Sequence, residues 1–376
     1  MAGKLDPAFE KLYNENVART PARPIDLPRL RESYSRLYSY ASAPGPDVGR
    51  IYDDIITIQA GDDNAPAPAP AASSSSSSSA EATTAVHLPV RVYEPDGPGP
   101  WPVHLDFHGG GWGLGDLDSE AHLCRHYCAK ARVAVIDVAY RLVPETPFPA
   151  AITDSFAALR FVRANGAARF RVRTDSISVG GVSAGGCIAL ALAHLARDAG
   201  IPLRLVAAGT PVVDDLSRYP SAAHSPWPSM RENEFAPTLN WARLAWFDRL
   251  RRSSMPPPGA PKEMQMQPGN QIEEEEKEEK EEKDEGRGAA GWFANLLAAP
   301  SFKGLARTLI FTAGADPLRD EGERYAQVLV ANGVDVRQRR FLGVPHPFVH
   351  MDRALPQARD FIDSTAREIR LAHWDP

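Results

Sequence analysis

The chain has 376 residues and a formal net charge of −6. Residues 273–285 hold ten acidic residues and three lysines, a net −7 that leaves the remainder of the chain near +1. A near-neutral remainder gives no electrostatic reason to expect nucleic acid or an anionic membrane surface as a partner. With three cysteines, no apolar core for a secretory signal in the first residues and no apolar run of membrane-spanning length, we expect a cytoplasmic protein without a transmembrane segment.

The first third of the chain combines helical and extended patterns. Within residues 1–50, apolar side chains such as Phe9, Leu12 and Tyr13 recur at helical spacing, which predicts N-terminal lid helices. Residues 51–59 and 86–93 alternate apolar and polar side chains like the two strands of a hairpin. The Pro-, Ala- and Ser-rich stretch between them, residues 60–85, offers nothing to pack and is predicted to be a disordered insert.

After Trp101, strands and helices alternate, a pattern typical of an α/β fold with a mostly parallel central sheet flanked by helices. We predict a core in two parts, residues 51–213 and 301–376, separated by a lid segment, residues 214–300, that contains a disordered acidic insert at about 253–290. The expected strands are 103–107, 133–138, 176–180, 203–208, 308–312 and 336–341, and the expected helices are 118–130, 150–163, 185–197, 321–332 and 357–372.

The strongest chemical signal is Gly181-Val182-Ser183-Ala184-Gly185, which fits G-x-S-x-G between an apolar strand and a helix of small residues. A serine on such a sharp turn projects its hydroxyl from the carboxyl end of the sheet, and the next amide points into the same space. Ser183 is therefore the candidate nucleophile, and Ala184 a candidate oxyanion donor. The alternative is an ordinary serine on a tight turn between a strand and a helix.

A second signal is the glycine run that begins at His108, directly after the strand VHLDF. Consecutive glycines let backbone N–H groups converge on one point, as the developing charge on a tetrahedral intermediate requires. Gly109, Gly110 and Gly111 are the candidate oxyanion donors. The alternative is a flexible glycine loop, which is disfavoured because lipases and esterases place such a loop ahead of the serine turn.

Candidates for the acid and the base follow later strands, in the chain order Ser, Asp, His of α/β-hydrolases. Asp316 ends the strand LIFTAGA, and Asp320 lies four residues further on. His346 follows the strand that ends near Val344, and His350 is its competitor. A carboxylate at a strand end can hold an imidazole in the tautomer that a serine nucleophile requires.

Four motifs carry a resemblance: HGGGWGLGD, YRLVPETPFPAAITD, GVSAGG and ADPLRDEG. Together they look like the hormone-sensitive-lipase-like family of α/β-hydrolases, over roughly residues 85–215 and 300–372. The resemblance implies the α/β-hydrolase fold, a Ser-Asp-His triad, a lid built from the N-terminus and the segment after the fifth core strand, and no cofactor. It selects Asp316 over Asp320, which is left as a helix N-cap, and the chain departs from it at Val182 and Pro347.

Two further clusters are predicted to have no catalytic role. His122 and His126 share a helical face, but Cys124 and Cys128 lie about 200° around the helix from them, so the four cannot converge on a metal. Arg141 and Asp154 are predicted to brace the nucleophile turn through hydrogen bonds. We therefore expect no metal at this helix.

The sequence predicts a serine hydrolase that cleaves a small, short-chain acyl ester through an acyl-enzyme. Its expected partner is the small-molecule ester itself. An amide or formamide hydrolase with the same triad, and a non-catalytic small-molecule receptor on the same fold, are the alternatives.

Overall fold

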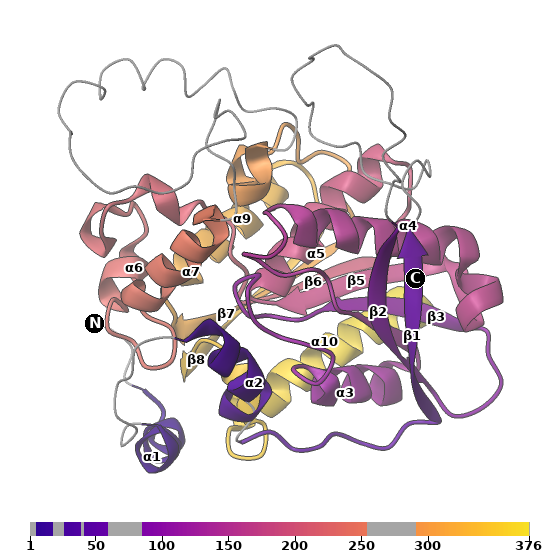
Figure 1. The fold of residues 1–376 in the computed structure, drawn as a ribbon, viewed down its shortest axis with the longest axis horizontal. Coiled ribbons are helices and arrows are strands. Elements are labelled where there is room, and N and C mark those ends of the chain that lie inside the picture. Colours follow the sequence, from indigo (N-terminus) through magenta and orange to yellow (C-terminus); the bar gives the residue numbers. More distant parts are fainter. Residues whose placement is uncertain (1–4, 18–25, 39–40, 59–84, 254–290, 376) are drawn as a thin grey trace.

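A computed structural model describes residues 5–17, 26–38, 41–58, 85–253 and 291–375. The two inserts predicted to be disordered, residues 60–85 and about 253–290, lie outside the described residues except for their outermost positions. The remainder forms one eight-stranded sheet with helices on both faces (Figure 1). This arrangement confirms the predicted fold class.

The sheet has the strand order β1-β2-β4-β3-β5-β6-β7-β8, and every strand predicted from the sequence is present. From β4 to β8 the strands are parallel, while β2 runs antiparallel to both β1 and β4. The predicted hairpin is therefore confirmed. The strands are β1 Arg50–Ile58, β2 Val86–Glu94, β3 Trp101–Phe107, β4 Ala134–Val138, β5 Val172–Val182, β6 Leu205–Gly209, β7 Thr308–Ala315 and β8 Val336–Pro345.

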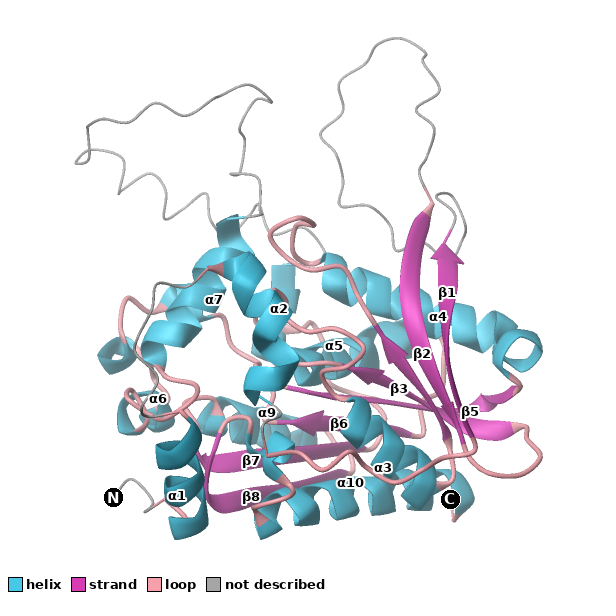
Figure 2. Cartoon of the chain, turned by 60° about the horizontal axis from the view of Figure 1, so that its bottom comes forward, coloured by secondary structure: helices cyan, strands magenta, loops and turns pink. Residues whose placement is uncertain are grey.

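Helices cover both faces of the sheet (Figure 2). On one face lie α3, Ala121–Ala131, and α10, Pro356–Trp374. On the other lie α4, Ala150–Phe170, α5, Ala184–Asp198, and α9, Arg319–Ala331. The central strands β3 and β4 are buried along their whole length because each face packs against helices, as parallel strands require.

Helix α4 continues past residue 163, where the sequence predicted its end, to Phe170. The added stretch includes Gly166, although glycine weakens a helix interior. Gly166 is tolerated because the helix passes close to β5 there: a Cβ on Gly166 would lie 3.0 Å from Val172 Cγ2. Close packing therefore outweighs local propensity at this position.

The remaining helices lie at the carboxyl end of the sheet. The N-terminal pair is α1, Pro7–Asn16, and α2, Leu27–Tyr38; the segment after β6 adds α6, Pro228–Glu232, and α7, Trp241–Ser253. Short 3-10 helices occupy Leu216–Arg218, Ala222–His224, Gly291–Ala294, Leu296–Ala298 and Phe348–Met351. In the part of the chain that the structure describes, no helix combines the length and apolar character that crossing a bilayer requires.

Candidate active site

Ser183 lies on a strained turn between β5 and α5. Its φ of 59° and ψ of −118° lie outside the regions that most residues adopt, and its N–H donates to Gly209 O at 2.8 Å. The glycines of the motif are required by close backbone approach: a Cβ would lie 1.7 Å from Phe107 O at Gly185 and 2.3 Å from the same oxygen at Gly181. The turn therefore needs this pattern to present the hydroxyl.

The structure brings the predicted acid, base and nucleophile into one hydrogen-bonded row. His346 Nε2 lies 2.9 Å from Ser183 Oγ, and His346 Nδ1 lies 2.9 Å from Asp316 Oδ2. Asp316 is fully buried at the end of β7, and its second oxygen accepts the Leu318 N–H at 2.9 Å. These contacts hold the carboxylate in place behind the imidazole.

The rival residues are engaged elsewhere. Asp320 pairs with Arg319 at 2.7 Å and accepts the Ser229 N–H at 2.7 Å. Helix α9 starts at Arg319 with Leu318 at its N-cap, so the prediction that Asp320 caps the helix is wrong; it lies in the first turn. His350 lies 4.0 Å from Glu120 and makes no hydrogen bond to the serine or to Asp316.

The glycine loop adopts backbone conformations that suit glycine. Gly110 has a φ of 117° and Gly111 a φ of 58°. A Cβ on Gly110 would lie 2.3 Å from Leu114 O. Within the described residues, no acceptor engages the N–H groups of Gly110 and Gly111. The N–H of Ala184, at the first position of α5, has no intrahelical partner either.

Gly109 differs from its two neighbours. Its N–H donates to Glu120 Oε1 at 2.8 Å, inside the protein. That hydrogen bond engages the Gly109 donor inside the protein, so of the three glycines predicted for the oxyanion hole Gly109 differs from Gly110 and Gly111. The loop therefore offers two free amides, at Gly110 and Gly111.

His108 anchors the start of the loop from within the core. Its ring stacks on Tyr140 with 4.3 Å between centroids, and its Nδ1 lies 2.8 Å from Gly109 O. Burial lowers the pKa of His108, so the ring stays neutral and can donate one hydrogen bond without an uncompensated charge. Tyr140 also donates to His108 O at 2.7 Å. The loop is thus held by aromatic packing and hydrogen bonds on its inner side.

Arg141 and Asp154 form a two-point ion pair, with distances of 2.8 and 2.6 Å, and the Arg141 N–H donates to the same carboxylate at 3.0 Å. The pair joins the loop after β4 to helix α4. The structure gives it no contact with Ser183, so the predicted brace acts on that loop and not on the nucleophile turn.

A mostly apolar cavity of about 70 Å³ opens over Ser183. Its floor consists of the residues named above: Gly110, Gly111, Ser183 and His346. Its cover comes from α2 and α7: Tyr34 lines the cavity from α2, and Leu244 and Phe247 line it from α7. We use the terms pocket floor and pocket cover for these two sets of residues.

Several contacts of the cover were not predicted from the sequence. A Cβ on Gly111 would lie 2.3 Å from Phe247 Cδ1, so this ring packs directly on the oxyanion loop. Arg31 of α2 donates to Gly113 O at 2.8 Å and pairs with Glu145 at 2.8 Å. The aromatic stretch at residues 241–247 was the sequence signal for the first contact, whereas no local pattern marks Arg31.

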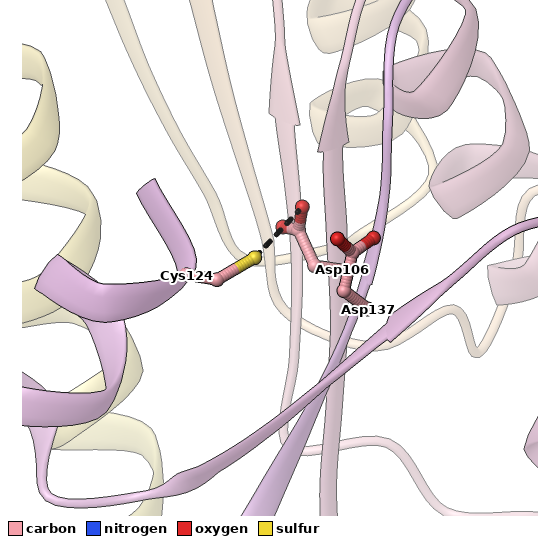
Figure 3. A group of neighbouring side chains, drawn as sticks. All are labelled: Asp106, Cys124 and Asp137. Carbon is pink, nitrogen blue, oxygen red and sulfur yellow. Dashed lines mark hydrogen bonds between the residues drawn. The ribbon is translucent and has the colours of Figure 1, made fainter. Parts of the chain in front are cut away.

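One set of three buried side chains behind the loop has the spacing of metal ligands: Asp106, Cys124 and Asp137 (Figure 3). Asp106 and Asp137 are partners on β3 and β4, and Cys124 Sγ lies 3.8 Å from Asp106 Oδ2. Burial raises the pKa of both Cys124 and Asp137 well above the usual range. Because metal ligands must be deprotonated, this donor set favours protons over a divalent cation.

Comparison with known proteins places this geometry in a family. A family model described as alpha/beta hydrolase fold matches residues 104–273 and 278–350, so the chain belongs to that family. The esterase LipI of Mycobacterium tuberculosis is 36% identical over 262 residues, 69% of this chain and 69% of that protein. The carboxylesterase NlhH of the same species is 35% identical over 268 residues, 69% of this chain and 70% of its own.

Solved structures agree with this assignment. A hyperthermophilic esterase from Pyrobaculum calidifontis matches with a TM-score of 0.73 and 26% identity, over 98% of each chain. The predicted resemblance to the hormone-sensitive-lipase-like α/β-hydrolases is confirmed by these relatives.

Proposed function

We propose that the chain is a carboxylic ester hydrolase in which Ser183 is the nucleophile, His346 the general base and Asp316 the residue that orients it. The observation that carries the proposal is the unbroken row Ser183 Oγ, His346 Nε2, His346 Nδ1, Asp316 Oδ2, with 2.9 Å at each hydrogen bond. A base within this distance of a hydroxyl can take its proton as the oxygen attacks.

In the first half of the reaction, Ser183 Oγ forms a bond to the ester carbonyl carbon while its proton moves to His346 Nε2. The carbonyl oxygen becomes an oxyanion, which accepts hydrogen bonds from the N–H groups of Gly110, Gly111 and Ala184. The bond to the alcohol oxygen then breaks, and His346 returns the proton to that oxygen. Asp316 stabilises the imidazolium between these two transfers.

In the second half, water adds to the acyl-enzyme by the same route. His346 takes a proton from the water as its oxygen bonds to the acyl carbon, and then gives that proton to Ser183 Oγ as the acyl bond breaks. A carboxylic acid leaves, and the serine hydroxyl is restored. These steps need no metal or cofactor.

The shape of the pocket favours a short acyl group. Its volume, about 70 Å³, is well below the ~150 Å³ of a protein cavity that binds benzene. Phe247 packs on Gly111 and limits the space beside the oxyanion loop. Apolar walls at Leu239, Leu244 and Phe247 suit an alkyl chain.

The alternatives from the sequence differ in what they require. An amide or formamide hydrolase would use the same triad, and the names of the relatives, esterase and carboxylesterase, favour the ester. A non-catalytic receptor has no need of a base hydrogen-bonded to the serine, whereas His346 has that contact.

The three cysteines are free and buried, which supports the predicted reducing, cytoplasmic location.

The test is a pair of measurements on the wild type and on Ser183→Ala. A fluorophosphonate probe should label the wild-type protein at Ser183, and p-nitrophenyl esters from acetate to decanoate should be cleaved fastest at the short end. In Ser183→Ala we expect no labelling and a fall in kcat on the order of 10⁶-fold, because the triad acts as a unit. Near-wild-type turnover in the variant would refute the proposal.

A further inference from the structure

Glu120 is a buried carboxyl group that the proposed reaction does not use. It is 1% exposed and precedes α3, at the position that would cap that helix. Its side chain makes no capping hydrogen bond to the helix. Instead, Oε1 accepts the N–H of Gly109 at 2.8 Å, eleven residues away along the chain. The carboxyl group is therefore directed at the oxyanion loop and away from its own helix.

This contact lies next to the reacting serine. A Cβ added to Gly109 would lie 3.4 Å from Glu120 Oε1 and 3.5 Å from Ser183 Cβ. The glutamate also lines the substrate cavity together with Ser183 and His346. Gly109 directly precedes Gly110 and Gly111, whose N–H groups are free. The hydrogen bond to the Gly109 N–H therefore fixes the position of the backbone that leads into these two donors. A shift of the loop by a fraction of an ångström would move both donors.

The Glu120 carboxyl group also interacts with the side chain of Asp106, from β3. Within the described residues, no donor or acceptor lies at hydrogen-bond geometry to Glu120 Oε2, and His350 Nε2 lies 4.0 Å from Oε1. Removing a buried polar group that is only half-satisfied costs little by itself, whereas the Gly109 N–H left behind would lose its only internal acceptor. The hydrogen bond to the Gly109 N–H is thus the contact of Glu120 that matters for the loop.

We infer that Glu120 is a positioning residue for the oxyanion hole, acting through the N–H of Gly109. The inference rests on the proposed function, because it assigns Glu120 a part in the same reaction. Glu120 does not touch the substrate in this role. It holds the amides of Gly110 and Gly111 at the place where negative charge develops, and such preorganised donors contribute strongly to the rate.

The charge of the carboxyl group fits this role. Burial, together with the nearby carboxyl group of Asp106, raises the pKa of Glu120 well above its usual range. A neutral acid can still accept a hydrogen bond at its carbonyl oxygen, and it places no negative charge beside the oxyanion. Glutamine has the same acceptor at the same reach, so it should substitute for the acid.

Three variants separate positioning from simple stability: Glu120→Gln, Glu120→Met and Glu120→Asp. Active sites are counted with a fluorophosphonate, and kcat and KM are measured with p-nitrophenyl acetate. We expect Glu120→Met, which keeps the length and removes the acceptor, to lose about 10- to 100-fold in kcat with KM nearly unchanged. Glu120→Gln should stay within about threefold of the wild type, because its carbonyl oxygen replaces Oε1.

Glu120→Asp keeps the acid but is one methylene too short to reach Gly109, so it should resemble the methionine variant. It also carries the test if Glu120→Met does not fold. The matched control is Glu368→Gln, another carboxyl that is 1% exposed, which pairs with Arg307 and Arg337 far from the site. This control should lose stability without losing kcat per active site.

Two results would overturn the inference: kcat within twofold of wild type in both the methionine and aspartate variants, or a glutamine variant as impaired as those two. Either result would leave the proposed function intact, provided that the wild type cleaves esters and is labelled at Ser183. A wild type that does neither would refute the proposed function first.

Discussion

The pocket floor and the pocket cover face the same cavity but are built in different ways. The floor depends on backbone: Ser183 holds a positive φ, and at Gly110 there is no room for a Cβ. The cover depends on side chains, such as the Phe247 ring against Gly111, and its helix α2 is held to the loop by the hydrogen bond from Arg31 to Gly113 O. Where the backbone leaves no room for a side chain, few substitutions are tolerated. A side chain that projects from a helix, in contrast, can be replaced by a larger or smaller one. We therefore propose that the floor fixes the reaction and that the cover sets the substrate.

The comparison predicts that losing the carboxylate that orients His346 lowers kcat more than any change in the cover does. Asp316→Asn keeps the shape of the acid but can present an N–H to His346 Nδ1, which favours the wrong tautomer for a base. We expect a loss of roughly 10⁴-fold in kcat with little change in KM, as for a triad without its orienting carboxylate. Steady-state kinetics with p-nitrophenyl acetate measure it.

The matched control is Asp320→Asn, four residues further on, whose carboxyl pairs with Arg319 and not with the imidazole. It should keep kcat within about threefold of the wild type, because it leaves the triad untouched. Two results would contradict the role of Asp316 as the residue that orients His346: an equal loss of kcat in the two variants, or a loss of less than about tenfold in Asp316→Asn.

A change in the cover should alter selectivity and leave the chemistry intact. Phe247→Ala removes the ring that packs on Gly111 and lengthens the cavity beside the acyl group. We expect the preferred p-nitrophenyl ester to move to a longer chain, with kcat/KM for octanoate relative to acetate rising about tenfold. That factor corresponds to about two further methylenes buried in the enlarged pocket, at about 0.8 kcal/mol each.

The control for this shift is Leu250→Ala, on the same helix, whose side chain lies beside Gly113 and does not line the cavity. Its ratio of octanoate to acetate should match that of the wild type. A Phe247→Ala enzyme that loses kcat for every ester, without any change in preference, would show that the ring belongs functionally to the floor.

The same contrast explains what could be predicted from the sequence. The nucleophile turn was predictable because the close approach of Phe107 O to Gly181 and Gly185 leaves a local pattern of small residues. The hydrogen bond from the Gly109 N–H to Glu120 could not be predicted, because it depends on where the fold places a side chain that follows eleven residues later in the chain. Asp320 was misplaced for a related reason: the start of α9 at Arg319 is set by the turn that Asp316 stabilises, and no capping pattern in the sequence marks it.

Behind the floor, the buried acids should affect stability and its pH dependence more than catalysis. Both oxygens of Asp137 lack a hydrogen-bond partner within the described residues, and Asp106 is its neighbour on β3. Burial and the charge of Asp106 raise the pKa of Asp137 well above its usual range. The folded chain thus holds a proton that the unfolded chain releases at neutral pH.

The sign of the effect follows from that difference in proton binding. The contribution of Asp137 to the free energy of unfolding is fully present below the unfolded pKa, and it is lost as the pH rises through the folded pKa. Asp137→Asn has no proton to lose, and its amide can donate to the Asp106 carboxylate. We expect it to be more stable than the wild type at pH 9 by about 1–3 kcal/mol, the cost of an unsatisfied buried polar group, with a smaller gain at pH 5.

Urea unfolding at the two pH values measures the difference, with Asp363→Asn as the control. Asp363 is an exposed partner of Lys130, so its loss should change stability by no more than about 0.5 kcal/mol at either pH. If Asp137→Asn were less stable than the wild type at pH 9, a partner would be stabilising the charged form of the Asp137 carboxyl group. The interpretation that this group is protonated in the folded chain would then be wrong. Unchanged kcat in the same variant would place the group outside the pocket floor.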